Sequence, residues 1–124
     1  MIDFNNASFM KLKEVQTAEG TNLVAPMLVD GEEVLHTFKT IRDMVIFTNK
    51  RIISVNVQGI TGTKKDFTSM PYSKIQVFSV ETAGTLDLDA ELTVWFSGVG
   101  KVKFEFKSNF DISAFNKLLS NYIL

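Results

Sequence analysis

The chain has 124 residues, with 13 basic and 14 acidic side chains and a formal net charge of −1, so it fits one domain and lacks the positive field of a general nucleic-acid binder. It contains no cysteine, which excludes disulfides and thiolate metal sites. No basic-apolar leader pattern opens it and no stretch approaches about 18 apolar residues, so we expect neither a signal peptide nor a spanning helix and place the protein in the cytoplasm.

Residues 1–30 carry the weakest structural signals, and we treat them as an N-terminal extension before a domain over residues 31–124. Phe9, with Leu12 three residues further on, predicts a short helix over Ala7–Val15. A polar run, Gln16–Asn22, follows this segment.

Strand signals begin at Val34. Val34–Phe38 and Arg42–Phe47 predict two strands, and Asn49-Lys50 predicts a two-residue turn because asparagine tolerates positive φ. This turn fixes the register of the hairpin that it closes, which pairs Ile46 with Ile53, Met44 with Val55 and Phe47 with Ile52.

The same hairpin, residues 44–57, is apolar on both faces. Ile46, Ile53 and Val55 can face the core, while Val45, Phe47 and Ile52 point the other way. Because a barrel strand normally alternates apolar and polar residues, we expect either another copy of the chain or residues 1–28 to cover the second face. Val45, Phe47 and Ile52 are therefore candidate interface residues.

Two more strands are expected at Asp66–Met70 and Ile75–Thr82. Beyond them, apolar residues occupy alternate positions throughout Leu86–Phe106, which predicts a hairpin around the loop Gly98-Val99-Gly100. The expected register pairs Phe96 with Val102, Val94 with Phe104, Trp95 with Lys103 and Glu91 with Lys107.

The last segment, Asp111–Leu124, has the spacing of an amphipathic helix, and Ser108 is its expected N-cap. Its apolar side carries Phe115, Leu118, Leu119 and Tyr122. The chain is therefore predicted to be mainly β, with about seven strands joined by hairpins and one closing C-terminal helix.

Several short motifs occur in a fixed order: Arg42-Asp43, Phe47–Ile53, Gln58–Gly62, Pro71–Ile75 and Glu81–Gly84. With these motifs the chain resembles the bacterial pleckstrin-homology (PH) domain family from about Gly31 to its C-terminus. The resemblance implies a seven-stranded, strongly bent barrel-like sandwich capped by the C-terminal helix. It also implies homo-oligomeric, ring-like assembly and no catalytic activity. Eukaryotic phosphoinositide-binding PH domains place more basic residues around a longer first hairpin loop.

No group of side chains predicts a reaction. His36 is the single histidine, and the serines lack an activating partner, so we expect no enzyme and no cofactor. Asp87, Asp89 and Glu91 alternate along the sequence, but carboxylates about 6.6 Å apart on one strand converge poorly on an ion. This row is typical of a solvated outer face, and we expect no metal site.

The remaining candidates are cations and one aromatic residue. Gly59–Lys65 joins strands instead of feeding a helix, so it does not match a phosphate-binding P-loop. Trp95 is either a contact for a protein partner or covered by the N-terminal segment. The candidate small-anion residues are Lys39, Arg42, Lys64 and Lys65.

Two functions are compatible with these features. The favoured one is a non-enzymatic, homo-oligomeric scaffold or protein-interaction module with a PH-like fold. The alternative is a module that binds a lipid head group or a small anion at the membrane surface. No nucleic-acid partner is expected, and membrane lipid is the less favoured partner.

Overall fold

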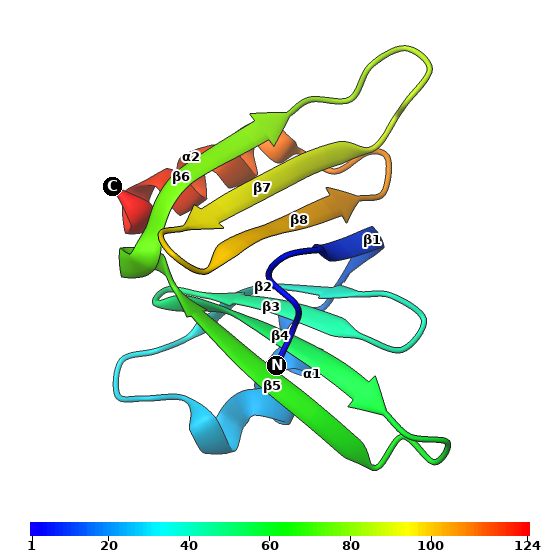
Figure 1. Cartoon of the computed structure of the whole chain (residues 1–124), viewed down its shortest axis with the longest axis vertical. Coiled ribbons are helices and arrows are strands. Elements are labelled where there is room, and N and C mark those ends of the chain that lie inside the picture. Colours follow the sequence, from blue (N-terminus) through cyan, green and yellow to red (C-terminus); the bar gives the residue numbers. More distant parts are fainter. The chain divides into compact units, whose positions relative to one another are not determined.

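The computed structural model describes all 124 residues. The chain forms eight strands, two α-helices and two short 3-10 helices, and one α-helix ends it (Figure 1). The prediction of a mainly β chain with a C-terminal helix is thus confirmed, with eight strands instead of seven. The chain divides into two compact units: Met1 with Glu14–Pro71, and Ile2–Lys13 with Tyr72–Leu124.

The first unit is an antiparallel sheet with a helix on one face. Its N-terminal part forms α1 (Thr17–Val24) and the 3-10 helix η1 (Ala25–Met27). The strands follow in chain order as β2 (Val34–Lys39), β3 (Met44–Thr48), β4 (Arg51–Gln58) and β5 (Lys64–Pro71). The predicted β3–β4 register is confirmed, with Ile46 opposite Ile53, Met44 opposite Val55 and Phe47 opposite Ile52.

Helix α1 covers one apolar face of this sheet. Val24 packs with Ile46, Ile53 and Val55, and all four side chains are at most 1% exposed. The burial of these side chains stabilises the unit because apolar area leaves water. Helix α1 therefore covers the face of the hairpin that the sequence assigned to the core, and not the Val45, Phe47 and Ile52 face that residues 1–28 were expected to cover as one alternative.

The opposite face of the hairpin is buried as well. Val45, Phe47 and Ile52 are each 0% exposed, and the Phe47 ring meets the Phe38 ring edge to face at 5.6 Å. This burial corrects the expectation that these three side chains lie on an exposed surface where another copy could bind. Apolar residues at successive positions reflect a sheet that is buried on both faces.

The second unit pairs the N-terminal strand with the last three. Its strand order is β1 (Ala7–Val15), β8 (Gly100–Phe106), β7 (Ala90–Phe96) and β6 (Ile75–Glu81), and residues of β1 up to Lys13 belong to it. β1 runs parallel to β8, and the other neighbours are antiparallel. The 3-10 helix η2 (Tyr72–Lys74) precedes β6.

The C-terminal helix α2 (Ile112–Ile123) belongs to the second unit and buries Phe115 and Leu119, as its spacing predicted. Of the other two residues predicted on its apolar side, Leu118 is half-buried and Tyr122 is 39% exposed. The Phe115 ring meets the Phe106 ring at 5.6 Å. The predicted N-cap is wrong: Asp111, not Ser108, caps the helix, and its Oδ1 accepts a hydrogen bond from Ala114 N at 3.0 Å.

Residues Ala7–Val15 are a strand, not the expected helix. Phe9 pairs with Phe104 and Leu12 with Phe106, so one extra residue lies between the two buried positions of β1. Lys11 takes this place with a φ of +56°. A β-bulge of this kind gives buried residues a spacing of three, and this spacing imitates a helix in the sequence.

The β7–β8 hairpin is shifted by two residues from its predicted register. Phe96 lies opposite Gly100, Val94 opposite Val102 and Trp95 opposite Lys101. The backbone of Phe4 passes over Gly100, the first residue of β8, and a Cβ on Gly100 would lie 2.3 Å from Phe4 O. The even shift keeps the predicted inward side chains of the two paired strands inward, and Leu92, Val94 and Phe104 are all 0% exposed.

The predicted strand also begins too early. β7 starts at Ala90, whereas Leu86 and Leu88 lie in the β6–β7 loop and are 99% and 58% exposed. This loop projects beyond the ends of its strands in Figure 1.

Candidate functional site

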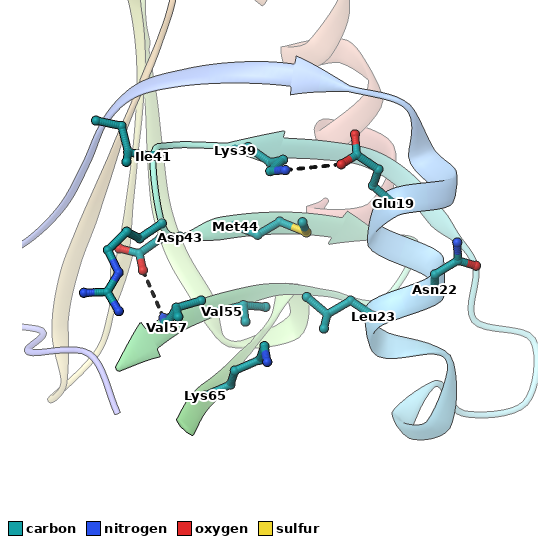
Figure 2. A pocket seen from close by; sticks show the side chains of 11 residues that line it. Glu19, Asn22, Leu23, Lys39, Ile41, Asp43, Met44, Val55, Val57 and Lys65 are labelled. Carbon is teal, nitrogen blue, oxygen red and sulfur yellow. Dashed lines mark hydrogen bonds and ion pairs between the residues drawn. The ribbon is translucent and has the colours of Figure 1, made fainter. Parts of the chain in front are cut away.

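A pocket of about 510 Å³ opens on the α1-bearing face of the first unit (Figure 2). Its walls come from α1, from the β2–β3 connection and from β2 to β5. Volumes of this size are typical of small-molecule sites, which are mostly apolar with a few placed polar groups.

The floor of the pocket is apolar. Met44 and Val55 lie directly opposite each other on β3 and β4, and Val57 is the next residue on the same side of β4. Leu23 reaches over them from α1, as Figure 2 shows. An aliphatic group that entered here would leave water on contact with these four side chains.

Three of the four predicted anion-binding residues line this pocket: Lys39, Arg42 and Lys65. Two acids, Glu19 and Asp43, also line it, so the cations outnumber the carboxylates. Figure 2 shows Lys39, on β2, and Lys65, on β5, on either side of Met44 and Val55. The arrangement is an apolar floor between cations.

The charged groups differ in how far they are already engaged. Lys39 Nζ lies 3.3 Å from Glu19 Oε1, and both side chains are nearly half exposed, so this ion pair is weak. Asp43 Oδ1 accepts a hydrogen bond from Val57 N at 3.1 Å. Arg42 Nη2 donates to Gly59 O at 2.7 Å, whereas Lys65 is exposed and takes part in no ion pair.

Lys64, the fourth predicted residue, does not line the pocket. Lys64 pairs with Gln58 and Lys65 with Val57 across β4 and β5. Because successive strand residues point to opposite faces, only Lys65 shares the face of Val57 and the pocket floor. The two adjacent lysines are thus a matched pair for experiments.

A buried ion pair fixes the segment that follows α1. Arg51 Nε lies 2.9 Å from Glu32 Oε2, Arg51 Nη2 donates to Met27 O at 2.8 Å, and the Glu32 side chain is 0% exposed. Burial of the Glu32 carboxyl opposes its ionisation, but hydrogen bonds from Arg51 and Thr48 outweigh this effect and lower the pKa of Glu32. The pair anchors the chain just beyond η1, next to the helix that forms one pocket wall.

The contribution of α1 to this site was not predicted from the sequence. Glu19 and Leu23 belong to a stretch that reads as a polar run, and Gly20 in its middle lowers its helix propensity. The available signal was Pro26 shortly after Leu23-Val24, since proline often follows the end of a helix.

The other candidates lie elsewhere. Trp95 is partly buried on β7, opposite Val77 and Lys101 instead of Lys103. The ring of His36 stacks on that of Phe38 at 6.0 Å, and its Nδ1 contacts the Glu14 carboxylate.

The acidic row is not a row on one strand. Asp87 and Asp89 precede β7 in the loop, and only Glu91 lies on the strand. Lys11 Nζ donates to Asp89 Oδ2 at 2.5 Å and thereby lowers the pKa of Asp89. Lys103 Nζ lies 3.1 Å from Glu91 Oε1, a diagonal pair where the sequence predicted Lys107.

Neither α-helix is long and apolar enough to cross a bilayer.

Comparison with known proteins identifies the family. The family model described as the bacterial PH domain matches residues 3–123. The uncharacterised protein YjqA of Bacillus subtilis (strain 168) is 44% identical over 117 residues, which cover 93% of this chain and 90% of YjqA.

Crystal structures extend the match to the fold. A DUF1696 family protein with a PH domain from Shewanella loihica PV-4 superposes with a TM-score of 0.80 at 39% identity, covering 94% of this chain and all of the other. A PH domain from Shewanella amazonensis SB2B has a TM-score of 0.66 at 40% identity, over 90% of this chain and 91% of that one. The resemblance seen in the sequence is confirmed: the chain has a PH-like fold and belongs to the bacterial PH domain family.

Proposed function

We propose that this chain is a non-catalytic binding module whose pocket beside α1 holds an aliphatic group that carries a negative charge. The observation behind this proposal is that three cations predicted separately from the sequence, Lys39, Arg42 and Lys65, line one pocket with an apolar floor. Its chemistry suits a ligand with two parts, because the floor accepts hydrocarbon and the rim accepts an anion.

The engagement of the rim cations suggests how a ligand is held. Lys65 offers an ammonium group without an ion pair, so it can meet an anion without losing an existing contact. Lys39 must first leave Glu19, a weak and exposed partner. Arg42, held by Gly59 O, supplies positive charge to the rim from a fixed position.

Binding of octanoate tests this proposal, with 1-octanol as the uncharged control and inorganic phosphate as the control without a chain. Backbone amide NMR should show shifts at Leu23, Met44 and Val57 with octanoate, and much smaller ones with either control. Shifts confined to residues outside the pocket would contradict the proposal.

Substitution of the two adjacent lysines sharpens the test. Lys65→Met should weaken octanoate binding about tenfold, since a hydrogen bond to a charged group contributes about 1.5–3 kcal/mol. Lys64→Met removes the same charge from the opposite face and should leave the dissociation constant almost unchanged. Glu19→Gln should strengthen binding because it frees Lys39. Equal losses for Lys64→Met and Lys65→Met would show that only general electrostatics attracts the anion.

A lipid head group is one source of such an anion, and the loops beside the pocket suit a bilayer surface. Ile41 and Ile60, in the β2–β3 and β4–β5 connections, are fully exposed, and Arg42 donates to Gly59 O between these connections. Co-sedimentation with phosphatidylglycerol and phosphatidylcholine vesicles distinguishes this source from a free anion. Charge-driven vesicle binding should weaken steeply with added salt.

The homo-oligomeric scaffold remains a second candidate, supported by a different surface. Val77, which is 54% exposed, lies opposite the partly buried Trp95 on neighbouring strands. Trp95 is the single tryptophan, so its fluorescence emission reports on this surface. An emission maximum that shifts to shorter wavelength with rising protein concentration would support assembly there, and a constant maximum would contradict it.

A further inference from the structure

We infer that the edge of β6 binds an extended segment of another protein, which adds to the sheet as one more strand with its acidic end beside Lys74. This surface lies in the second unit and shares no residue with the pocket beside α1. Three features support the inference: an unpaired backbone edge, the absence of charges that would protect this edge, and opposite charges at its two ends.

The backbone of β6 is unpaired along one side. The strand order ends at β6, so β7 is its single neighbour in the sheet (Figure 1). Alternate residues of a strand direct their N–H and C=O groups to opposite edges, so about half of these groups in Ile75–Glu81 point away from β7. An extended peptide supplies donors and acceptors at the spacing that this edge requires.

The edge of β6 lacks the residues that usually prevent strand addition. β5, the strand at the other end of the strand order, begins with two lysines and an aspartate and ends with Pro71. Charged residues and proline block the pairing of an edge strand with another chain. β6 has no charged residue before its last position, Glu81, and its pairing with β7 is irregular only between Ile75 and Val77. The regular edge available to a partner is therefore Val77–Glu81.

Apolar side chains lie along this edge on both faces of the sheet. On one face, Val77 is 54% exposed. On the other face, Phe78 lies opposite Val94 and Val80 lies opposite Leu92, and both β6 side chains are only half-buried although their partners are fully buried. An added strand with aliphatic residues at alternate positions would remove more of this apolar area from water.

The two ends of the edge carry opposite charges. Tyr72 of η2 stacks on Tyr122 of α2, with ring centroids 6.1 Å apart, so the start of β6 lies beside the last turns of this helix. Lys74 directly precedes β6, is exposed and takes part in no ion pair. Glu81 is exposed at the other end. Charge complementarity therefore places an acidic group of the partner at the Lys74 end.

A segment with free ends suits this edge better than a folded second copy. The β6–β7 loop projects beyond the end of its strand (Figure 1). In an edge-to-edge pair of copies, the chain beside β6 would have to pass the projecting loop of its neighbour. An extended segment of about five residues meets no such constraint, and its main-chain hydrogen bonds supply much of the affinity in recognition of this kind.

A synthetic peptide tests the inference on the full chain. The probe is Lys-Val-Thr-Val-Thr-Val-Glu-Glu, acetylated at its N-terminus and amidated at its C-terminus. At millimolar concentration it should shift the backbone amide NMR signals of β6 and slow the exchange of the β6 amides that point away from β7. The absence of shifts along β6, or shifts confined to the pocket residues Leu23, Met44 and Val57, would overturn the inference.

Two methylated peptides test whether the backbone edge is used. One carries a methyl group on the backbone nitrogen of each valine, and the other on that of each threonine. Because valine and threonine alternate, only one of these sets directs its N–H groups toward β6. One peptide should therefore lose binding while the other retains it, and equal behaviour of the two peptides would overturn the inference.

A cycle of charge changes tests the position of the acidic end. Replacing both glutamates of the peptide with glutamine should weaken binding to the wild type about threefold, since exposed ion pairs contribute little. The same replacement should have almost no effect on binding to Lys74→Gln. Lys101→Gln is the matched control, because Lys101 is an exposed lysine of β8 without an ion pair, and it should preserve the threefold difference. A difference that persists in Lys74→Gln would overturn the inference.

The inference and the proposed function can fail separately. Octanoate should shift amides around the pocket without shifting those of β6, whatever the peptide does. If exchange of the β6 amides slows with rising concentration of the wild type alone, the edge is occupied by a second copy and the inference is overturned.

Discussion

Replacing Gly20 with alanine tests how closely α1 is held against the sheet that it shares with the pocket. A Cβ added at Gly20 would lie 2.3 Å from Thr37 Oγ1, 3.1 Å from Thr37 Cγ2 and 3.2 Å from Thr37 Cβ. Because threonine is branched at Cβ, its side chain has few rotamers in which to avoid the new atom. The helix must therefore move away from β2.

Two effects of opposite sign decide the outcome. Alanine is more favourable than glycine within a helix by about 0.8–1.0 kcal/mol, whereas inserting a methyl group into a packed site typically costs about 1–3 kcal/mol. We expect Gly20→Ala to lower the free energy of unfolding by about 1 kcal/mol in the wild type. In a Thr37→Ala background, where Oγ1 and Cγ2 are gone, the same substitution should raise it by up to about 1 kcal/mol.

Urea denaturation followed by circular dichroism on the four proteins of this cycle measures both effects. A difference of 1 kcal/mol moves the midpoint by roughly 0.3–1 M urea for a small protein. Thr37 Oγ1 makes no hydrogen bond, so Thr37→Ala leaves no polar partner unsatisfied. The reasoning is refuted if Gly20→Ala stabilises the wild type as much as it stabilises the Thr37→Ala protein.

Three further predictions concern stability. Glu32→Gln should lower the free energy of unfolding at pH 7 by about 1–3 kcal/mol. Because the pKa of Glu32 lies below its ordinary 4.5 in the folded chain, the stability difference between wild type and variant is present above pH 4.5 and shrinks as the pH falls below it. Urea titrations at a series of pH values measure this difference. Gly100→Ala should destabilise the chain more than Gly98→Ala, because a Cβ at Gly100 meets the Phe4 backbone whereas a Cβ at Gly98 meets nothing within 4 Å. At Gly98 only the left-handed backbone conformation is unfavourable for alanine, by about 1–2 kcal/mol. Comparable thermal midpoints for the two variants would contradict this. Truncation before Asp111 should leave an unfolded or aggregated protein, because it removes the helix that buries aromatic side chains of the second unit, and a soluble fragment that melts cooperatively would contradict this.

The architecture was predictable wherever local periodicity and burial agree. Alternation marked β7 and β8 and placed Leu92, Val94 and Phe104 inside, and the Asn49-Lys50 turn fixed the β3–β4 register. Two features misled because local periodicity does not specify them. The bulge at Lys11 gave β1 a helical spacing, and the alternation in β7 and β8 is equally compatible with hairpin registers that differ by two residues.

The candidate site was predictable in its charges but not in its shape. Lys39, Arg42 and Lys65 stood out as cations, and the alternation of strand side chains separates Lys64 from Lys65 only once the register with β4 is known. The wall from α1 was missed because packing against the sheet, and not helix propensity, stabilises a short segment that contains Gly20. Leu86 was wrongly predicted to lie in a strand, because the alternation of apolar residues extends into the loop before Ala90, where strand pairing begins.

The parallel pairing of β1 with β8 has a consequence for biosynthesis. Ala7 is synthesised long before its partner Val102. The nascent chain can close the β2–β5 meander from neighbouring segments, whereas β1 must wait until β8 has emerged. A strand with an unsatisfied edge and two apolar side chains, Phe9 and Leu12, is therefore exposed during synthesis, and it is here that a chaperone would have most to protect.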